Sequence, residues 1–398
     1  MIAPNPFFVD RGFSVRVYEE ARVLQQKGHQ VRICTYHCGR NPPGTDVRRI
    51  QRTPWYGQER VGASGHKLYL DALLLGLVWR ESLDFRPGII HAHLHEGALV
   101  GEIIGRILRV PVVFDYQGGL VGELQEKGAL PLTGLSVRFC HWLEKRIVLG
   151  ADVVVVSATR MVRRLIEQYG LPQERIRVST EGVDTDHFRP AARNTALKSV
   201  LGLPENSRVV VFLGTLAAYQ GVDCLLQAVP LVVQACPEAH FLVMGYPNVD
   251  HYRRIAASLG VGKHVTFTGR IDYDRAAEYL ALGDVAVSPK LSAYEANGKL
   301  YNYMACGLPT VAFDTEVSRE VLGDTGIYAR LGDVSSLADG LIQLLRDRDL
   351  ATKLGAKARA RVVRLFSLAA VAPRLEDCYA LACRNRAHRM RSGSARRR

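Results

Sequence analysis

The sequence has no apolar run long enough to cross a membrane and no pattern typical of a secretory signal. Its hydrophobic segments all fall short of the ~20 residues that a transmembrane helix needs. The first residues, Met1-Ile-Ala-Pro-Asn-Pro6, lack a charged segment followed by a long apolar one. These absences predict a protein that works in the cytoplasm.

Closely spaced cysteine pairs are missing as well. The eight Cys are scattered along the chain, and none of them forms a C-x-x-C pair. The sequence therefore predicts neither a disulfide framework nor a zinc site. Cys34, His37 and Cys38 lie close together, but no second set of ligands follows them. We expect no metal in this protein.

Acidic residues are outnumbered, and the formal net charge is +13. Part of the excess lies in the C-terminal tail, with seven Arg and no acid in the last fifteen residues. We expect residues 387–398 to be a disordered basic tail, which either contacts anionic partners or keeps the chain soluble. No zinc-binding, helix-turn-helix or aromatic RNA-binding motif is present, so no specific nucleic-acid partner is predicted.

More basic residues lie on two predicted helices near residues 136–169. They are Arg138, Lys145, Arg146, Arg160, Arg163 and Arg164. Clusters of this kind favour an anionic membrane surface, where the protein would sit peripherally on the inner face. Ordinary solvated helix faces are the alternative.

Strand and helix patterns alternate in two successive runs, residues 1–190 and 207–366. Residues 191–206 lack a strand pattern and end in Gly and Pro, as an interdomain linker does. The pattern predicts an α/β protein with two Rossmann-like, doubly wound domains whose loops face a central cleft. Ile2-Ala3 is shorter than the usual strand of ~5–6 residues, so the sequence predicts a truncated first strand. A last helix, 367–386, is expected to cross back to the N-terminal domain.

The stretch 286–315 reads as strand, polar loop, helix, turn and strand. Its loop gathers a carboxylate, an amide, a glycine and an ammonium group: Glu295, Asn297, Gly298 and Lys299. Such a loop, at the carboxyl end of a parallel strand, is where α/β sheets bind phosphates. We therefore expect a phosphate-bearing ligand here, with a solvated connection as the alternative.

Two neighbouring strands of the first half also end in polar segments. The first, 88–93, carries His91 and His93 on one face and ends in a loop, Leu94-His-Glu-Gly97, that holds His95 and Glu96. The next ends in Asp115-Tyr-Gln-Gly-Gly119. The carboxyl ends of parallel strands open into one crevice, so we expect these side chains to hydrogen-bond a polyhydroxyl ligand. Structural histidines are the main alternative. A metal trio is the other, although no carboxylate pattern favours it.

Six short segments, in this order and spacing, resemble those of the family-4 retaining glycosyltransferases of the GT-B fold. They are Lys27-Gly-His-Gln-Val31, Ala151-Asp-Val-Val-Val-Val-Ser157, Glu181-Gly-Val-Asp184 with Phe188-Arg-Pro190, Phe212-Leu-Gly-Thr215, Tyr219-Gln-Gly-Val-Asp223 and Met304-Ala-Cys-Gly-Leu-Pro-Thr-Val311. The resemblance implies transfer of a hexose or related sugar from a UDP- or GDP-linked donor to a hydroxyl of a sugar or lipid-linked acceptor. It implies retention of the anomeric configuration, a role in glycolipid, cell-wall or exopolysaccharide synthesis, and no metal or other cofactor.

The resemblance also assigns residues to the reaction. Lys299 would be the cation on the diphosphate, with Glu295 and His93 as further catalytic residues. The other donor-binding positions would be Gly12, Gly214, Thr215, Gln220, Gly245, Arg270, Asn297, Gly298 and Asn302. The acceptor and sugar side would hold His91, His95, Glu96 and Gln117. No carboxylate nucleophile is obvious, so the leaving phosphate would itself take the acceptor proton.

The chain departs from the family at its charged positions. An Arg and a Lys that usually contact the diphosphate are replaced by the neutral Thr215 and Gln220, and one of two family Glu residues is Asn302. Glu295 lies one residue from the position of the other Glu. The pair Lys299-Leu300 can replace the missing positive charge. The alternatives are a catalytically degenerate GT-B protein and a GT-B nucleotide-sugar epimerase or hydrolase, for which no carboxylate pair is visible.

Overall fold

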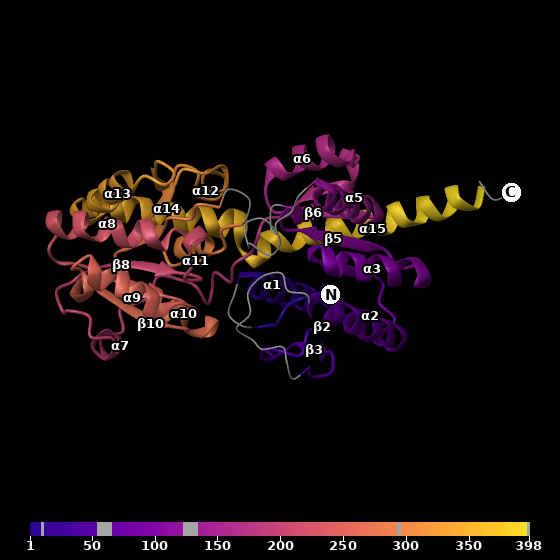
Figure 1. Ribbon diagram of the computed structural model, residues 1–398, viewed down its shortest axis with the longest axis horizontal. Helices are drawn as coiled ribbons and strands as arrows, with labels where there is room; N and C mark the ends of the chain where they lie inside the picture. The colour runs from indigo at the N-terminus through magenta and orange to yellow at the C-terminus, as the bar shows by residue number, and fades with distance from the viewer. Residues whose placement is uncertain (9–11, 54–65, 122–133, 293–295, 396–398) are drawn as a thin grey trace. The chain divides into compact units, whose positions relative to one another are not determined.

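The computed structural model of the chain describes residues 1–8, 12–53, 66–121, 134–292 and 296–395. The chain divides into two compact units (Figure 1). The first unit contains the first strand, Arg16–Thr180 and Val371–Arg398, and the second is built mainly from Glu181–Ala370. Each unit contains one parallel sheet, which confirms the predicted α/β class. Among the described helices, none combines the length and apolarity that a membrane span requires.

The first unit has a seven-stranded sheet in the order β3-β2-β1-β4-β5-β6-β7. Its strands are β1 Ile2–Ala3, β2 Arg32–Thr35, β3 Asp46–Arg49, β4 Ile90–His93, β5 Val112–Tyr116, β6 Val153–Val156 and β7 Ile176–Val178. Its helices include α1 Gly12–Gln26, α2 His66–Phe85, α3 Leu94–Leu108, α5 Gly134–Gly150 and α6 Thr159–Tyr169. The central strands β5 and β6 are buried along their whole length, because parallel strands are covered on both faces.

The strand order decides which helices share a face of this sheet. The chain steps from β1 to β2 in one direction, but from β3 to β4 and onward to β7 in the other. Because such crossovers are right-handed, α1 covers one face, and α2, α3, α5 and α6 cover the opposite face.

The second unit has a six-stranded sheet in the order β10-β9-β8-β11-β12-β13. Its strands are β8 Arg208–Leu213, β9 Ala239–Met244, β10 Val265–Gly269, β11 Val285–Ser288, β12 Thr310–Phe313 and β13 Gly326–Ala329. Its helices are α7 Thr195–Val200, α8 Val222–Ala235, α9 Val249–Ser258, α10 Ala276–Leu280, α11 Lys299–Ala305, α12 Glu316–Leu322, α13 Val334–Arg346 and α14 Arg348–Phe366. The strand order reverses between β8 and β11, and ligands of such sheets bind outside the carboxyl ends at this point.

The division between the units falls at Thr180, earlier than the linker expected at 191–206. Residues just after Thr180 are held inside the second unit by hydrogen bonds to main-chain carbonyls. The Val183 amide donates to the Phe366 carbonyl over 2.9 Å. The Arg359 guanidinium donates to the carbonyls of Thr185 and Phe188, each over 2.8 Å. Residues 191–206 themselves contain α7.

The last helix, α15, spans Leu368–Ala395, and from Val371 it belongs to the first unit. The expectation of a disordered tail from residue 387 is wrong over the described residues, because the helix continues. Its basic side chains explain why. Arg389 donates to the carbonyls of Gly150 over 2.9 Å and Ala151 over 3.1 Å, and Arg386 donates to the Gly105 carbonyl.

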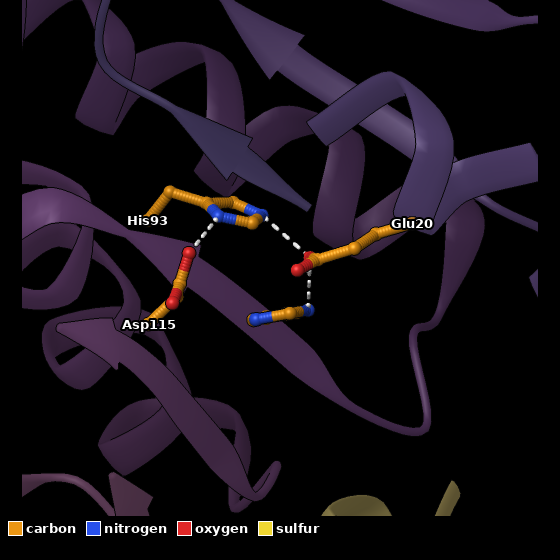
Figure 2. Close-up of side chains that lie close together, drawn as sticks. Glu20, His93 and Asp115 are labelled. Atoms are coloured by element: carbon orange, nitrogen blue, oxygen red, sulfur yellow. Dashed lines mark hydrogen bonds and ion pairs between the residues drawn. The ribbon is translucent and has the colours of Figure 1, made fainter. Parts of the chain in front are cut away.

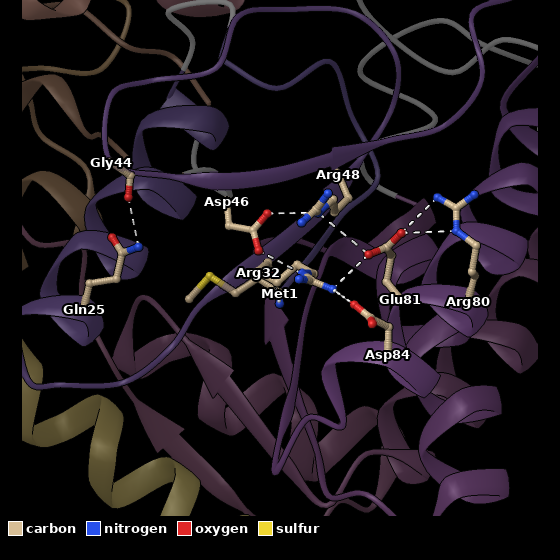
Figure 3. Close-up of polar contacts among 9 residues, drawn as sticks. All are labelled: Met1, Gln25, Arg32, Gly44, Asp46, Arg48, Arg80, Glu81 and Asp84. Atoms are coloured by element: carbon tan, nitrogen blue, oxygen red, sulfur yellow. Dashed lines mark hydrogen bonds and ion pairs between the residues drawn. The ribbon is translucent and has the colours of Figure 1, made fainter.

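An ion-pair network lies at the amino ends of the first strands (Figure 3). Arg32 pairs with Asp46 over 2.8 Å, Glu81 over 3.0 Å and Asp84 over 2.8 Å, which ties β2 to β3 and α2. An apolar cavity of about 500 Å³ lies beside it, lined by Val31, Phe85 and other residues. Of the histidines predicted to contact a sugar, His91 is among the residues that line this cavity.

Candidate active site

The loops that follow β8, β9 and β10 are connected by main-chain hydrogen bonds from two glycines. The Gly214 amide donates to the Met244 carbonyl over 2.9 Å, and the Gly245 amide to the Gly269 carbonyl over 3.0 Å. A Cβ atom on Gly245 would lie only 1.8 Å from the Gly214 carbonyl oxygen. Glycine is therefore required at position 245 for the two loops to approach each other.

Lys299 is brought to these loops as the first residue of α11. Its Nζ donates to Gln220 Oε1 over 2.7 Å and lies 4.3 Å from the centre of the Phe212 ring. A Cβ atom on Gly214 would lie 2.9 Å from the same Nζ, so the absence of a side chain there leaves room for the ammonium group. Three predicted donor-binding residues, Gly214, Gln220 and Lys299, thus meet at the point where the strand order reverses.

Buried polar side chains hold residues 296 and 297, shortly before Lys299. Asn297 is 3% exposed, and its Nδ2 donates to Ser288 Oγ over 2.9 Å. The Lys290 ammonium, which is 6% exposed, donates to the Ala296 carbonyl over 2.6 Å. The side chain of Asn297 therefore holds the loop to the end of β11. Sequence reasoning missed Lys290 and Ser288, although a basic residue directly after a strand and Pro289 was a visible signal.

The remaining predicted donor-side residues are more dispersed. A Cβ atom on Gly298 would lie 2.7 Å from Glu181 Oε2, so this glycine allows a close approach of that carboxylate. Asn302 is buried in α11, Thr215 is half-buried, and Arg270 is exposed with its guanidinium 5.5 Å from the centre of the Tyr246 ring. Glu295 lies outside the described residues.

In the first unit, Asp115 is the centre of a buried polar cluster (Figure 2). The Arg16 guanidinium donates to both of its oxygens, over 2.9 and 2.7 Å. His93 Nδ1 lies 2.9 Å away, and Gln117 Nε2 donates over 2.7 Å. Burial alone raises the pKa of Asp115, but Arg16 and His93 outweigh it and hold the pKa below its ordinary value. The strand register creates this contact, because His93 and Asp115 are partners across β4 and β5.

The same cluster contains ligand types that metals use. Single ligand atoms of Glu20, His91, His93 and Asp115 lie within 4.8 Å of one another, and all four residues are buried. The surroundings do not fit a cation, because the Asp115 oxygens already accept four hydrogen bonds and the Arg16 guanidinium lies 3.2 Å from Glu20. A positive group therefore already occupies the position between the two carboxylates.

The other two histidines are also engaged within the first unit. His91 Nδ1 lies 2.9 Å from the Tyr379 hydroxyl, and burial followed by the neighbouring His93 lowers the pKa of His91. His95 Nε2 lies 3.3 Å from Glu144 Oε1, which also accepts from the Tyr116 hydroxyl over 2.8 Å. Contacts of this kind, between side chains of the same unit, are typical of histidines with a structural role. Their predicted contact with a sugar remains a prediction.

Gln117 and Glu96 differ from the histidines because both keep part of their surface exposed. Gln117 follows β5 and is oriented by Asp115, and Glu96 lies in the first turn of α3. Gly12 begins α1 and is exposed, and a Cβ atom there would meet nothing within 4 Å. Lack of space therefore does not explain a glycine at this position.

Two sequence profiles match the chain. The one described as Glycosyltransferase Family 4 matches residues 11–187, and the one described as Glycosyl transferases group 1 matches residues 207–347. This chain belongs to the family-4 glycosyltransferases. Among curated relatives, the D-inositol 3-phosphate glycosyltransferase of Thermobispora bispora is 28% identical, over 95% of this chain and 91% of its own. The protein of the same name from Nocardia farcinica is 27% identical, over 93% and 85%.

Solved structures of GT-B glycosyltransferases share the fold. Sucrose-phosphate synthase from Thermosynechococcus elongatus superposes with a TM-score of 0.77 at 20% identity, over 95% of this chain and 96% of that one. Anabaena HepE in complex with UDP-glucose superposes with a TM-score of 0.74 at 18% identity, over 94% and 98%. These likenesses confirm the predicted GT-B fold.

In this family-4 glycosyltransferase, the positive charge near the end of β8 is supplied from another element. Thr215 and Gln220 are neutral, and Gln220 contributes an oxygen that binds the ammonium group of Lys299. The cation at this point therefore comes from α11, a different element from the β8 loop. The sequence signal for this cation was the Lys299-Leu300 pair.

Proposed function

We propose that this family-4 glycosyltransferase transfers a hexose from a UDP- or GDP-linked donor to an acceptor hydroxyl, with retention of the anomeric configuration. The observation that carries the proposal is the Lys299 ammonium group, held by Gln220 and Phe212 beside Gly214. A cation fixed at the carboxyl ends of β8 and β11 suits the diphosphate of such a donor.

The chemistry gives this cation its role. Breaking the glycosyl–phosphate bond leaves negative charge on the departing diphosphate and positive charge on the anomeric carbon. A preorganised cation aimed at the leaving oxygens stabilises that transition state, and no metal is needed for it. The leaving phosphate then takes the proton of the acceptor hydroxyl on the face it departs from, which gives retention.

The relatives suggest the first compounds to test. The names of the two curated relatives state that they glycosylate D-inositol 3-phosphate, and the HepE structure contains UDP-glucose. UDP-glucose is therefore the first donor to test, with GDP- and dTDP-sugars beside it. D-inositol 3-phosphate and lipid-linked sugars are the first acceptors. A role in glycolipid, cell-wall or exopolysaccharide synthesis at an anionic membrane is part of the same proposal.

The test begins with binding and proceeds to turnover. A donor nucleotide should raise the melting temperature by mass action, and the nucleotide giving the largest shift identifies the base. Lys299→Ala should lower kcat by about 10²- to 10³-fold, the usual effect of losing one group that stabilises the transition state. Lys299→Arg should retain more activity, and Lys263→Ala, an exposed lysine of the same unit, should retain all of it. Unchanged turnover in Lys299→Ala would refute the assignment.

A catalytically degenerate GT-B protein is the second candidate, favoured by the neutral Thr215 and Gln220 and by Asn302. It would bind a nucleotide and yet turn over no donor with any acceptor. An epimerase or hydrolase would convert the donor without an acceptor. Analysis of the products by NMR separates these outcomes, and the anomeric coupling in a transfer product tests retention.

A further inference from the structure

Helix α5 exposes large apolar side chains that a soluble surface does not require. Leu135 is 82% exposed, Phe139 59% and Trp142 57%. They follow one another at helical spacing, and the rings of Phe139 and Trp142 stack with their centres 5.8 Å apart. The outer face of α5 therefore carries an apolar stripe that includes two aromatic residues, Phe139 and Trp142.

Basic residues flank the stripe. Arg138, Lys145 and Arg146 are exposed on the same helix, and with the three apolar residues they fall within an arc of about 120° at the α-helical repeat. The one acid of α5, Glu144, is 0% exposed and accepts a hydrogen bond from Tyr116. The outer face of α5 thus combines apolar and basic side chains without an acid.

The apolar surface continues on α3. Leu99, Ile103 and Ile107 are exposed at 41%, 37% and 59%, at intervals of four residues. Helices α3 and α5 pack against each other, and both cover the same face of the first sheet. Their outer sides therefore point away from the sheet together. Arg106, also exposed, adds a basic group to this stripe.

We propose that this face, formed by the outer sides of α5 and α3, docks the first unit on an anionic lipid bilayer. Tryptophan and phenylalanine suit the interface between headgroups and acyl chains, and arginine and lysine suit anionic headgroups. A second copy of the chain fits less well, because a two-fold interface would bring Arg138, Lys145 and Arg146 of one copy against the same residues of the other. This proposal shares with the proposed function only the idea of a lipid-linked acceptor; the docking face itself is argued from α5 and α3.

The test is sedimentation of the 398-residue protein with vesicles. Vesicles of phosphatidylcholine with phosphatidylglycerol should bind it, and pure phosphatidylcholine should bind it much more weakly. Added salt should reduce binding, because it screens the basic residues. The emission of Trp142 should shift to shorter wavelength on binding, and this shift should disappear in Trp142→Phe.

Variants separate the contribution of the apolar side chains to vesicle binding from that of the basic side chains. Phe139→Ser with Trp142→Ser should reduce partitioning to anionic vesicles at least tenfold at any salt concentration. Removing Lys145 and Arg146 together as Ala should reduce it about 25-fold at low salt, since each basic residue near an anionic surface contributes about fivefold. The matched controls lie on the second unit: Val200→Ser, an 83% exposed apolar residue, and Arg253→Ala with Arg254→Ala on α9 should bind as the unchanged protein does.

Equal binding to both kinds of vesicle, or loss of binding only in the control variants, would overturn the proposal. A concentration-dependent dimer that the Phe139→Ser and Trp142→Ser changes abolish would instead identify a self-association surface, and would also overturn it. Turnover with a soluble acceptor is measured in parallel. A protein that binds vesicles but transfers no sugar refutes the proposed function and leaves the docking face intact.

Discussion

Asp115 illustrates how a single buried carboxylate organises the first unit. It is 0% exposed and accepts from Arg16, which is 4% exposed. We predict that Asp115→Asn lowers the free energy of unfolding by about 3–5 kcal/mol, because it removes one of the two buried carboxylates, Asp115 and Glu20, that balance the charge of the buried Arg16 guanidinium. Urea denaturation measures this. Asp250→Asn is the control, since its pair with Arg253 is exposed and worth about 0–1 kcal/mol.

Glu102 makes a second residue-level prediction, about pH. Burial raises its pKa from 4.5 to about 8. Between these two pKa values the folded state keeps a proton on Glu102 that the unfolded chain has released. The contribution of Glu102 to the free energy of unfolding therefore falls as pH rises from about 4.5 to about 8, and it does not change further at higher pH. Glu102→Gln should remove this fall. The stability difference between the variant and the unchanged protein should favour the variant more at pH 8.5 than at pH 5. Parallel pH profiles would contradict it.

At the residue scale, the sequence indicated which side chains are polar but not what they contact. The contact of His91, His93 and His95 with a sugar stays a prediction. In the structure, one nitrogen of each histidine lies near Tyr379, Asp115 or Glu144, respectively. Tyr379 is far away in the sequence, and the Asp115 contact depends on strand register. No local pattern carries either piece of information. Lys299, in contrast, was predictable because its chemistry and its position after a strand are both local.

At the scale of elements, α15 carries a prediction of its own. Its Arg389 supplies donors to the carbonyls that end α5, Gly150 and Ala151. Charge-assisted bonds of this kind are worth about 1.5–3 kcal/mol, so Arg389→Ala should lower the unfolding free energy of the first unit by that amount. Arg384→Ala, a change at an exposed arginine five residues earlier on the same helix, should have little effect. Equal losses in both variants would show that general charge, not these bonds, is responsible.

Long periodic elements were predictable, and short or unusual ones were not. Strand β3, Asp46–Arg49, has no apolar alternation because it is an edge strand whose Asp46 pairs with Arg32. Residues 94–97 were expected to form a loop after β4, but they are the first turn of α3. The chain makes this sharp turn because Leu94 adopts a left-handed φ of 59°, a conformation that a sequence pattern does not predict for leucine.

At the scale of the whole molecule, the GT-B fold was predictable because the alternation of strand and helix occurs twice. Each run specifies its own sheet through local hydrophobic periodicity. The boundary was less predictable, because it depends on long-range main-chain bonds such as that of Val183 to Phe366. The tail was mispredicted for a similar reason: Arg386 and Arg389 find carbonyl acceptors far away in the sequence.

The division into two units predicts how the whole protein unfolds. The apolar core of the second unit and that of the first are separate clusters, each centred on its own sheet. We therefore expect two transitions in calorimetry. UDP should raise the transition of the second unit, because Gly214, Gln220 and Lys299 all belong to it, and Lys299→Ala should reduce that shift. Asp115→Asn should lower only the other transition. If UDP and Asp115→Asn moved both transitions together, the two units would unfold as one cooperative body, and the sites would be energetically coupled.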